Sequence, residues 1–166
     1  MIEAEFISKF DDADAVDMSD TTTNITEENI KELHILADRY PQAQSAIIPM
    51  LHLVQSIDGK VSGEGVRHIA RILDLPEAVV LGVVTFYTMF HKEAVGKHLI
   101  GVCTTSLCAV MGGDMVYETV RKHLGLDGEG TTEDGAFTLE RVECNAACDF
   151  APVMMLNWEF MDNMTP

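Results

Sequence analysis

Apolar residues recur with a helical period in the first part of the chain, after an initial acidic stretch. Side chains three or four positions apart predict helices over residues 26–40, 43–57, 62–73 and 76–90. Thr26 followed by two glutamates is typical of a helix start, Pro41 ends the first helix, and Pro76 is expected at the first position of the fourth. We therefore predict a small helical bundle over residues 25–95.

The pattern changes after Gly96. It predicts strands over residues 98–103, 137–142 and 153–156, and a helix over residues 112–124 that ends at Gly125. The last strand is expected to continue through Asn157 to Phe160, and a loop rich in Gly, Thr and Asp precedes the second strand. The fold class is therefore α/β, with a small α/β unit over residues 96–166.

The two ends of the chain suggest further features. Residues 1–24 hold seven acids against the single cation Lys9, which predicts a mobile acidic tail, although its apolar residues could also dock on a partner. Thr165 and Pro166 are the residue types that begin a helix. We therefore expect the second unit to lack one final helix in this chain.

Composition and charge exclude several classes of protein. The chain has 166 residues, 47% of them apolar, which is enough for one good core or two small ones. A net charge of −16, from 11 basic and 27 acidic residues, argues against a nucleic-acid surface or an anionic membrane surface and favours a basic protein partner. No secretory signal or membrane-spanning run is visible, so we expect a cytoplasmic protein.

The candidate chemistry lies in the four cysteines of the chain, Cys103, Cys108, Cys144 and Cys148. They form a C-x4-C pair and a C-x3-C pair, and each pair follows a predicted strand, so strand ends should present both pairs together. Four thiolates can hold an iron–sulfur cluster or a structural zinc, or form two disulfides. Cytoplasmic thiols are kept reduced, which favours metal. The apolar and small flanking residues favour iron–sulfur over zinc.

Other candidate motifs give weaker evidence of a function. The six histidines are scattered over the predicted elements and are expected to be structural or surface residues. Residues 63–68 lack the third glycine of a dinucleotide-binding fingerprint and follow no strand. A dithiol enzyme of the thioredoxin type would need C-x-x-C, which neither pair provides. The sequence therefore shows no catalytic residue and no nucleotide site.

The order of these segments closely resembles the family of 24 kDa-type subunits of respiratory complex I (NADH-quinone oxidoreductase), whose members are thioredoxin-like 2Fe-2S ferredoxins. The resemblance covers residues 26–166. Its matching segments are SAIIP (45–49), VVTFYTMF (83–90), residues 98–113 with the first cysteine pair, TTEDG (131–135) and residues 142–152 with the second pair.

The resemblance implies a helical bundle followed by a thioredoxin-like domain. It further implies one 2Fe-2S cluster ligated by Cys103, Cys108, Cys144 and Cys148, which passes one electron at a time close to the FMN of a partner. The implied partners are an NADH-binding flavoprotein subunit and a further iron–sulfur subunit, in a complex at the inner face of the cell membrane. The chain would then be a subunit of an oxidoreductase without a substrate site of its own.

One departure from the family and several alternatives remain. Many relatives have Leu-Gly where this chain has Asn145-Ala146, a change expected to alter hydrogen bonding to the cluster but not its ligands. An NAD-linked or electron-bifurcating hydrogenase, or a formate dehydrogenase, uses an equivalent subunit. A structural zinc-binding interaction module is an alternative of a different class.

Overall fold

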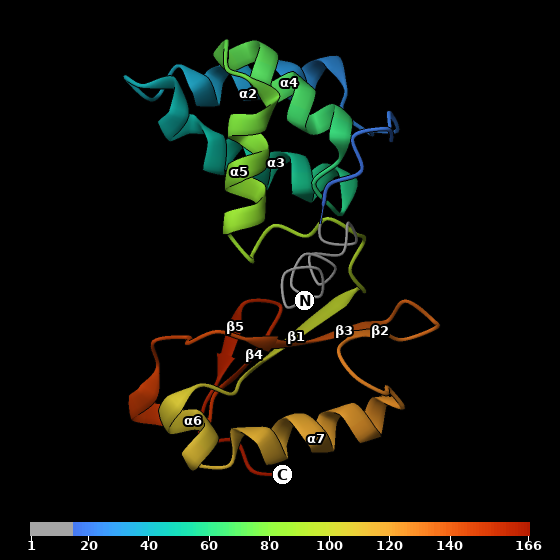
Figure 1. Cartoon of the computed structure of the whole chain (residues 1–166), viewed down its shortest axis with the longest axis vertical. Helices are drawn as coiled ribbons and strands as arrows, with labels where there is room; N and C mark the ends of the chain where they lie inside the picture. Colours follow the sequence, from blue (N-terminus) through green and yellow to red (C-terminus); the bar gives the residue numbers. More distant parts are fainter. Residues whose placement is uncertain (1–14) are drawn as a thin grey trace, which may run out of the picture. The chain divides into compact units, whose positions relative to one another are not determined.

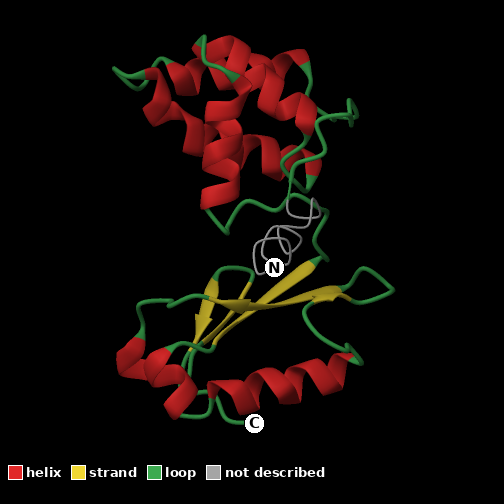
Figure 2. Cartoon of the chain, viewed as in Figure 1, coloured by secondary structure: helices red, strands yellow, loops and turns green. Residues whose placement is uncertain are grey.

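The computed structural model describes residues 15–166, and contacts divide the chain into a unit that ends at Ala94 and a second unit from Val95 to Pro166. The first unit is helical and the second combines helices with a sheet (Figures 1 and 2). No helix described between residues 15 and 166 is long and apolar enough to cross a lipid bilayer.

Between residues 15 and 94, the helical unit contains four α-helices and one 3-10 helix. They are α2 (Glu27–Ala37), η2 (Ala43–Ala46), α3 (Ile47–Asp58), α4 (Gly63–Leu73) and α5 (Glu77–Phe86). Thr26 and Asn29 form a reciprocal cap at the start of α2, and the Ser62 hydroxyl accepts a hydrogen bond from the Gly65 N–H at the start of α4. These caps satisfy N–H groups that have no partner inside their helix, so both helix starts agree with the prediction.

Three predicted helices differ from the structure. The first ends at Ala37 instead of residue 40, with Asp38 at its C-cap. The second predicted helix is divided into η2 and α3, with Pro49 in the first turn of α3, where a proline removes no intrahelical hydrogen bond. The fourth begins at Glu77, so Pro76 lies at the N-cap position, without a side-chain capping hydrogen bond, instead of at the first helical position, and the helix ends at Phe86 instead of Phe90. Tyr87 has an extended backbone, and the turn after it carries Phe90 into the core at 2% exposure, while Phe86 remains 77% exposed.

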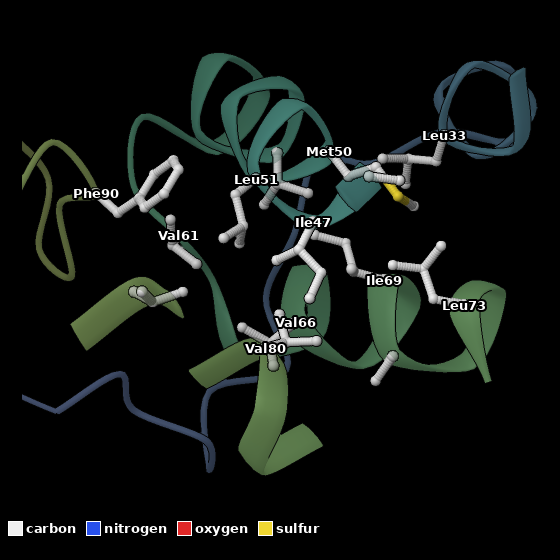
Figure 3. Close-up of a cluster of buried hydrophobic side chains, with 14 of the residues drawn as sticks. Leu33, Ile47, Met50, Leu51, Val61, Val66, Ile69, Leu73, Val80 and Phe90 are labelled. Atoms are coloured by element: carbon white, nitrogen blue, oxygen red, sulfur yellow. The ribbon is translucent and has the colours of Figure 1, made fainter. Parts of the chain in front are cut away.

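One continuous apolar core holds the helical unit together (Figure 3). Every helix described in this unit contributes side chains to the core. A fully buried valine, leucine, isoleucine, phenylalanine or methionine side chain stabilises the fold by about 1.5–3 kcal/mol. The large side chains with almost no exposed surface include Leu33, Ile47, Met50, Leu51, Val66, Ile69 and Val80.

Residues 15–24 contact this unit. Val16 is buried in the core, the Asp20 carboxylate pairs with Lys60 at 3.2 Å, and Asp58 accepts hydrogen bonds from Thr23 Oγ1 at 2.9 Å and the Asn24 N–H at 2.7 Å. The acidic tail predicted over residues 1–24 therefore has a packed part from residue 15 onward. Residues 1–14 of that prediction lie outside the described part of the chain.

The second unit is built on a five-stranded sheet with the order β2-β3-β1-β4-β5. Its strands are β1 (His98–Cys103), β2 (Gly130–Thr131), β3 (Phe137–Val142), β4 (Met154–Leu156) and β5 (Glu159–Met161). β1 and β3 are parallel, and the other pairs are antiparallel. The helices are α6 (Ser106–Val110), α7 (Gly113–Leu124) and the 3-10 helix η3 (Cys148–Phe150).

Helix α7 packs on one face of this sheet (Figure 2). Val116 and Tyr117 of α7 are buried with Ile100, Leu139 and Met154 of the strands. A parallel pair needs a crossover connection, and α7 is the longest helix in the connection between β1 and β3. The sequence predicts both strands and this helix, which the structure confirms.

Three local features of the sheet unit were not expected. Asn157 and Trp158 have left-handed φ angles of 50° and 71°, so the chain turns there and β5 returns antiparallel to β4, where we predicted one longer strand. Helix α6 and the short strand β2 lie in stretches predicted as loops. Each is five residues or shorter, too short for a periodic pattern to reveal.

Candidate metal centre

The topology of the sheet brings the two cysteine pairs to the same end. β1 and β3 are parallel neighbours in which Cys103 is aligned with Val142, so the chain leaves both strands at the same edge. Cys103 is the last residue of β1, and Cys144 lies two positions after the end of β3. The two cysteine pairs therefore follow strands that end at the same end of the sheet, as predicted.

The first pair is held by regular structure. Cys103 and Cys108 are 2% and 3% exposed, and the Cys103 N–H donates to the Val153 carbonyl at 3.1 Å. Gly113 fixes the start of α7 against this pair, because a Cβ there would lie 2.5 Å from the Cys103 carbonyl oxygen and 2.9 Å from that of Cys108. A side chain at position 113 would therefore push the backbone of the first pair away from α7.

The second pair belongs to an exposed loop and the short helix η3. Cys144 and Cys148 are both exposed. Ala146 has a left-handed φ of 54°, and its N–H donates to Cys144 Sγ at 3.4 Å. The Phe150 N–H closes the loop by donating to the Ala147 carbonyl at 3.0 Å. The backbone at position 146 thus approaches a sulfur.

The pKa shifts show that the thiols act on one another. Burial opposes ionisation of Cys103, but hydrogen bonds from Thr105, from the Asn145 N–H and from the Cys108 thiol outweigh it and lower its pKa. Burial raises the pKa of Cys108. The negative charge of Cys144, with smaller contributions that include Cys103, raises the pKa of Cys148. Charges on both pairs therefore interact.

The four thiols form two adjoining pairs. Cys103 and Cys108 shift each other's pKa, and Cys144 raises the pKa of Cys148. Within residues 15–166, no three His, Cys, Asp or Glu side chains converge closely enough to hold a single metal ion. Two thiolates on each of two irons is the ligand arrangement of a 2Fe-2S cluster, so two pairs are a suitable donor set for that group.

A buried donor beside the thiols has no partner in the chain. The side-chain nitrogen Nδ2 of Asn145 is the one buried side-chain nitrogen or oxygen among residues 15–166 without a hydrogen-bond partner. A buried amide is normally hydrogen-bonded, so this atom fits a site whose acceptor comes from outside the chain.

Sequence reasoning missed two residues of this site. Thr105 places its hydroxyl 3.4 Å from Cys103 Sγ, and Gly113 supports the backbone of the first pair. The Gly-Gly pair at 112–113, soon after the first cysteine pair, was a signal for a close backbone approach. A threonine near a cysteine carries no such signal.

Comparison with known proteins gives consistent results. Residues 33–166 match the family described as thioredoxin-like [2Fe-2S] ferredoxin. The E subunit of NADH-quinone oxidoreductase from Mycobacterium tuberculosis is 52% identical over 128 residues, which are 77% of this chain and 51% of that protein. The second E subunit of the same enzyme from Rhizobium meliloti is 36% identical over 134 residues, which are 81% of this chain and 80% of that protein. The chain thus spans about half the length of the mycobacterial relatives.

A solved structure shares the fold. A chain of the NAD+-reducing [NiFe]-hydrogenase in its air-oxidized state superposes with a TM-score of 0.63 and 15% sequence identity, over 72% of this chain and 20% of that chain. At this level of identity the likeness concerns the fold alone.

Proposed function

Because the chain belongs to the thioredoxin-like [2Fe-2S] ferredoxin family, we propose that Cys103, Cys108, Cys144 and Cys148 hold one 2Fe-2S cluster. We further propose that the chain is the 24 kDa-type electron-transfer subunit of an NADH-quinone oxidoreductase, beside the flavin of a partner subunit. The observation that carries the first proposal is the meeting of two thiol pairs at one edge of the sheet. Relatives named as the E subunit of that enzyme support the second.

When bound, a 2Fe-2S cluster accepts and releases one electron at a time. The residues of the chain would set its environment. The buried first pair and the apolar side chains packed around it, Val142, Ala147, Ala151 and Val153, keep water from that side of the site. Backbone N–H groups and the Thr105 hydroxyl stabilise negative charge on the sulfurs. The exposed acids Glu143 and Asp149 beside the second pair oppose added negative charge.

The proposed partners follow from what the sequence contains. It has no P-loop or complete dinucleotide fingerprint, so NADH and FMN would bind to a flavoprotein subunit, and a further iron–sulfur subunit would accept electrons from that module. The net charge of −16 favours docking on a basic face. The complex would place this chain at the cytoplasmic side of the membrane without insertion of its own.

An equivalent subunit of an NAD-linked hydrogenase or a formate dehydrogenase is the second candidate. The shared fold with a chain of an NAD+-reducing hydrogenase is compatible with this candidate, although a fold alone does not identify the complex to which a subunit belongs. Purification of the tagged chain from its native cells distinguishes the two. Membrane subunits of a quinone oxidoreductase should copurify, whereas a hydrogenase or formate dehydrogenase catalytic subunit would support the second candidate.

The cluster is tested by metal analysis of anaerobically purified protein. We expect about two iron atoms and two acid-labile sulfides per chain, and the EPR signal of a 2Fe-2S cluster after reduction. Cys144→Ser should lower the iron content and the sulfide content. Ser56→Ala, in the helical unit, is the control and should leave both unchanged. One zinc per chain without sulfide would refute the cluster and support a structural zinc module.

A further inference from the structure

We infer that the side-chain amide of Asn145 donates a hydrogen bond to a sulfur of the bound cluster and thereby raises its reduction potential. The inference rests on the proposed function, because the acceptor is a sulfur of the 2Fe-2S group or of its ligands. Asn145 binds no iron in this scheme and acts as a positioning residue.

The first observation is the unpartnered donor. Asn145 Nδ2 is buried and donates to no atom of residues 15–166. A buried N–H group without an acceptor lowers stability, because the water it would otherwise bind has been removed. A group of this kind next to a cofactor site points to an acceptor that the cofactor supplies.

The second observation is the position of Asn145 between the two thiol pairs. Its backbone N–H lies near Cys103 of the first pair and lowers the pKa of that thiol, and Cys144 of the second pair precedes it in the chain. The next N–H, that of Ala146, donates to Cys144 Sγ at 3.4 Å. Asn145 is therefore anchored where sulfurs of both pairs lie close by.

The surroundings limit the available acceptors. The two buried cysteines pack with Val153, and the partly buried residues around them are Val142, Ala147 and Ala151. These side chains carry no hydrogen-bond acceptor, so the side-chain acceptors around the first pair are the sulfurs and the Thr105 hydroxyl, which already lies 3.4 Å from Cys103 Sγ. The sulfurs are therefore the acceptors that we assign to the buried amide.

The direction of the effect follows from charge. Reduction adds an electron to the cluster, and a hydrogen bond strengthens when its acceptor becomes more negative. A donor therefore stabilises the reduced state more than the oxidised state, which raises the potential. Removal of the amide should favour the oxidised state.

The test is a redox titration of the full-length, cluster-loaded protein, followed by EPR. Asn145→Leu keeps a similar volume but removes the donor, and we expect the ratio of reduced to oxidised cluster at a fixed potential to fall three- to tenfold, or about 30–60 mV. Asn145→Gln, which keeps an amide, should recover part of the shift. Asn24→Leu is the matched control, because it makes the same change on the surface of the helical unit and should leave the potential unaltered.

A second readout does not depend on any variant. Wild-type protein labelled with 15N only in the side-chain amide of asparagine should show a 15N coupling to the reduced cluster by pulsed EPR. Absence of that coupling, or an unchanged potential in Asn145→Leu, would overturn the inference and leave the amide bound to water. Failure of the proposed function looks different, because wild-type protein would then contain no iron and sulfide at all.

Discussion

The two cysteine pairs differ in how the fold holds them. Cys103 and Cys108 are buried on β1 and α6, whereas Cys144 and Cys148 are exposed on a loop and the short helix η3. The first pair is therefore placed by the same packing that forms the sheet unit, and the second pair depends more on local hydrogen bonds. This difference suggests that the first pair fixes the position of the centre and that the second pair completes it.

The largest effect is expected where the first pair meets α7. Gly113→Ala places a Cβ within 3.0 Å of two backbone carbonyl oxygens, those of Cys103 and Cys108, which flexible side chains cannot relieve. We expect a loss of about 1–3 kcal/mol in the free energy of unfolding, measured with urea, and a lower iron content. Gly128→Ala meets no atom within 4 Å and is the control. Equal stability of the two variants would show that the first pair tolerates displacement.

The next effect separates the pairs by burial. In reduced, iron-free protein, Cys108→Ala removes a buried sulfur and leaves a small cavity, which should cost about 1 kcal/mol of unfolding free energy. Cys144→Ala removes an exposed sulfur and should change stability by less than about 0.5 kcal/mol. When iron and sulfide are supplied, neither variant should retain the cluster, because each lacks one ligand. A larger cost for Cys144→Ala than for Cys108→Ala would reverse the proposed roles of the pairs.

A smaller effect concerns the ionisation of the second pair. The charge of Cys144 raises the pKa of Cys148, so less thiolate is present at Cys148 near pH 8 than in an ordinary thiol. In iron-free protein, Cys144→Ala should shift the alkylation of Cys148 to lower pH and speed it a few-fold at pH 8, because the thiolate is the reactive form. Mass spectrometry after iodoacetamide treatment measures the rate. Cys108→Ala is the control, and equal acceleration in both variants would contradict a specific effect of Cys144.

Much of the framework of the site could be predicted from the sequence. Residues 98–103 and 137–142 form strands with the predicted bounds, because apolar runs between turn residues define them. The cysteines stood out because there are four of them in two close pairs. The edge at which they meet follows from the parallel pairing of the two strands.

The parts that could not be predicted depend on tertiary contacts. Asn157 is a residue type that tolerates the left-handed region, but Trp158 also adopts it, which a bulky residue rarely does, so the turn before β5 had only a weak signal in the sequence. Glycine is needed at position 113 because the carbonyl oxygens of Cys103 and Cys108 lie close to it in the folded chain. Likewise, only the folded chain shows that the Asn145 side-chain amide has no hydrogen-bond partner. Tertiary packing determines both features, and the order of residues along the chain does not reveal it.

The smallest expected effect concerns charge near the exposed pair. Glu143 is exposed and precedes Cys144, so Glu143→Gln removes a negative charge close to the cluster. A charge at about 10 Å in water contributes about 0.4 kcal/mol, so we expect the midpoint potential to rise by about 20 mV. The shift should shrink as the salt concentration increases, because ions screen exposed charges.

The control for this change is Glu133→Gln, which removes the same charge in the turn before β3. The cysteines follow the other end of that strand, and six residues of strand span about 20 Å, twice the screening length at about 0.1 M salt. Glu133→Gln should therefore leave the potential unchanged. A fall, or no change, for Glu143→Gln would show that local charge at the exposed pair does not set the potential. The buried pair and its hydrogen bonds would then be the dominant influence.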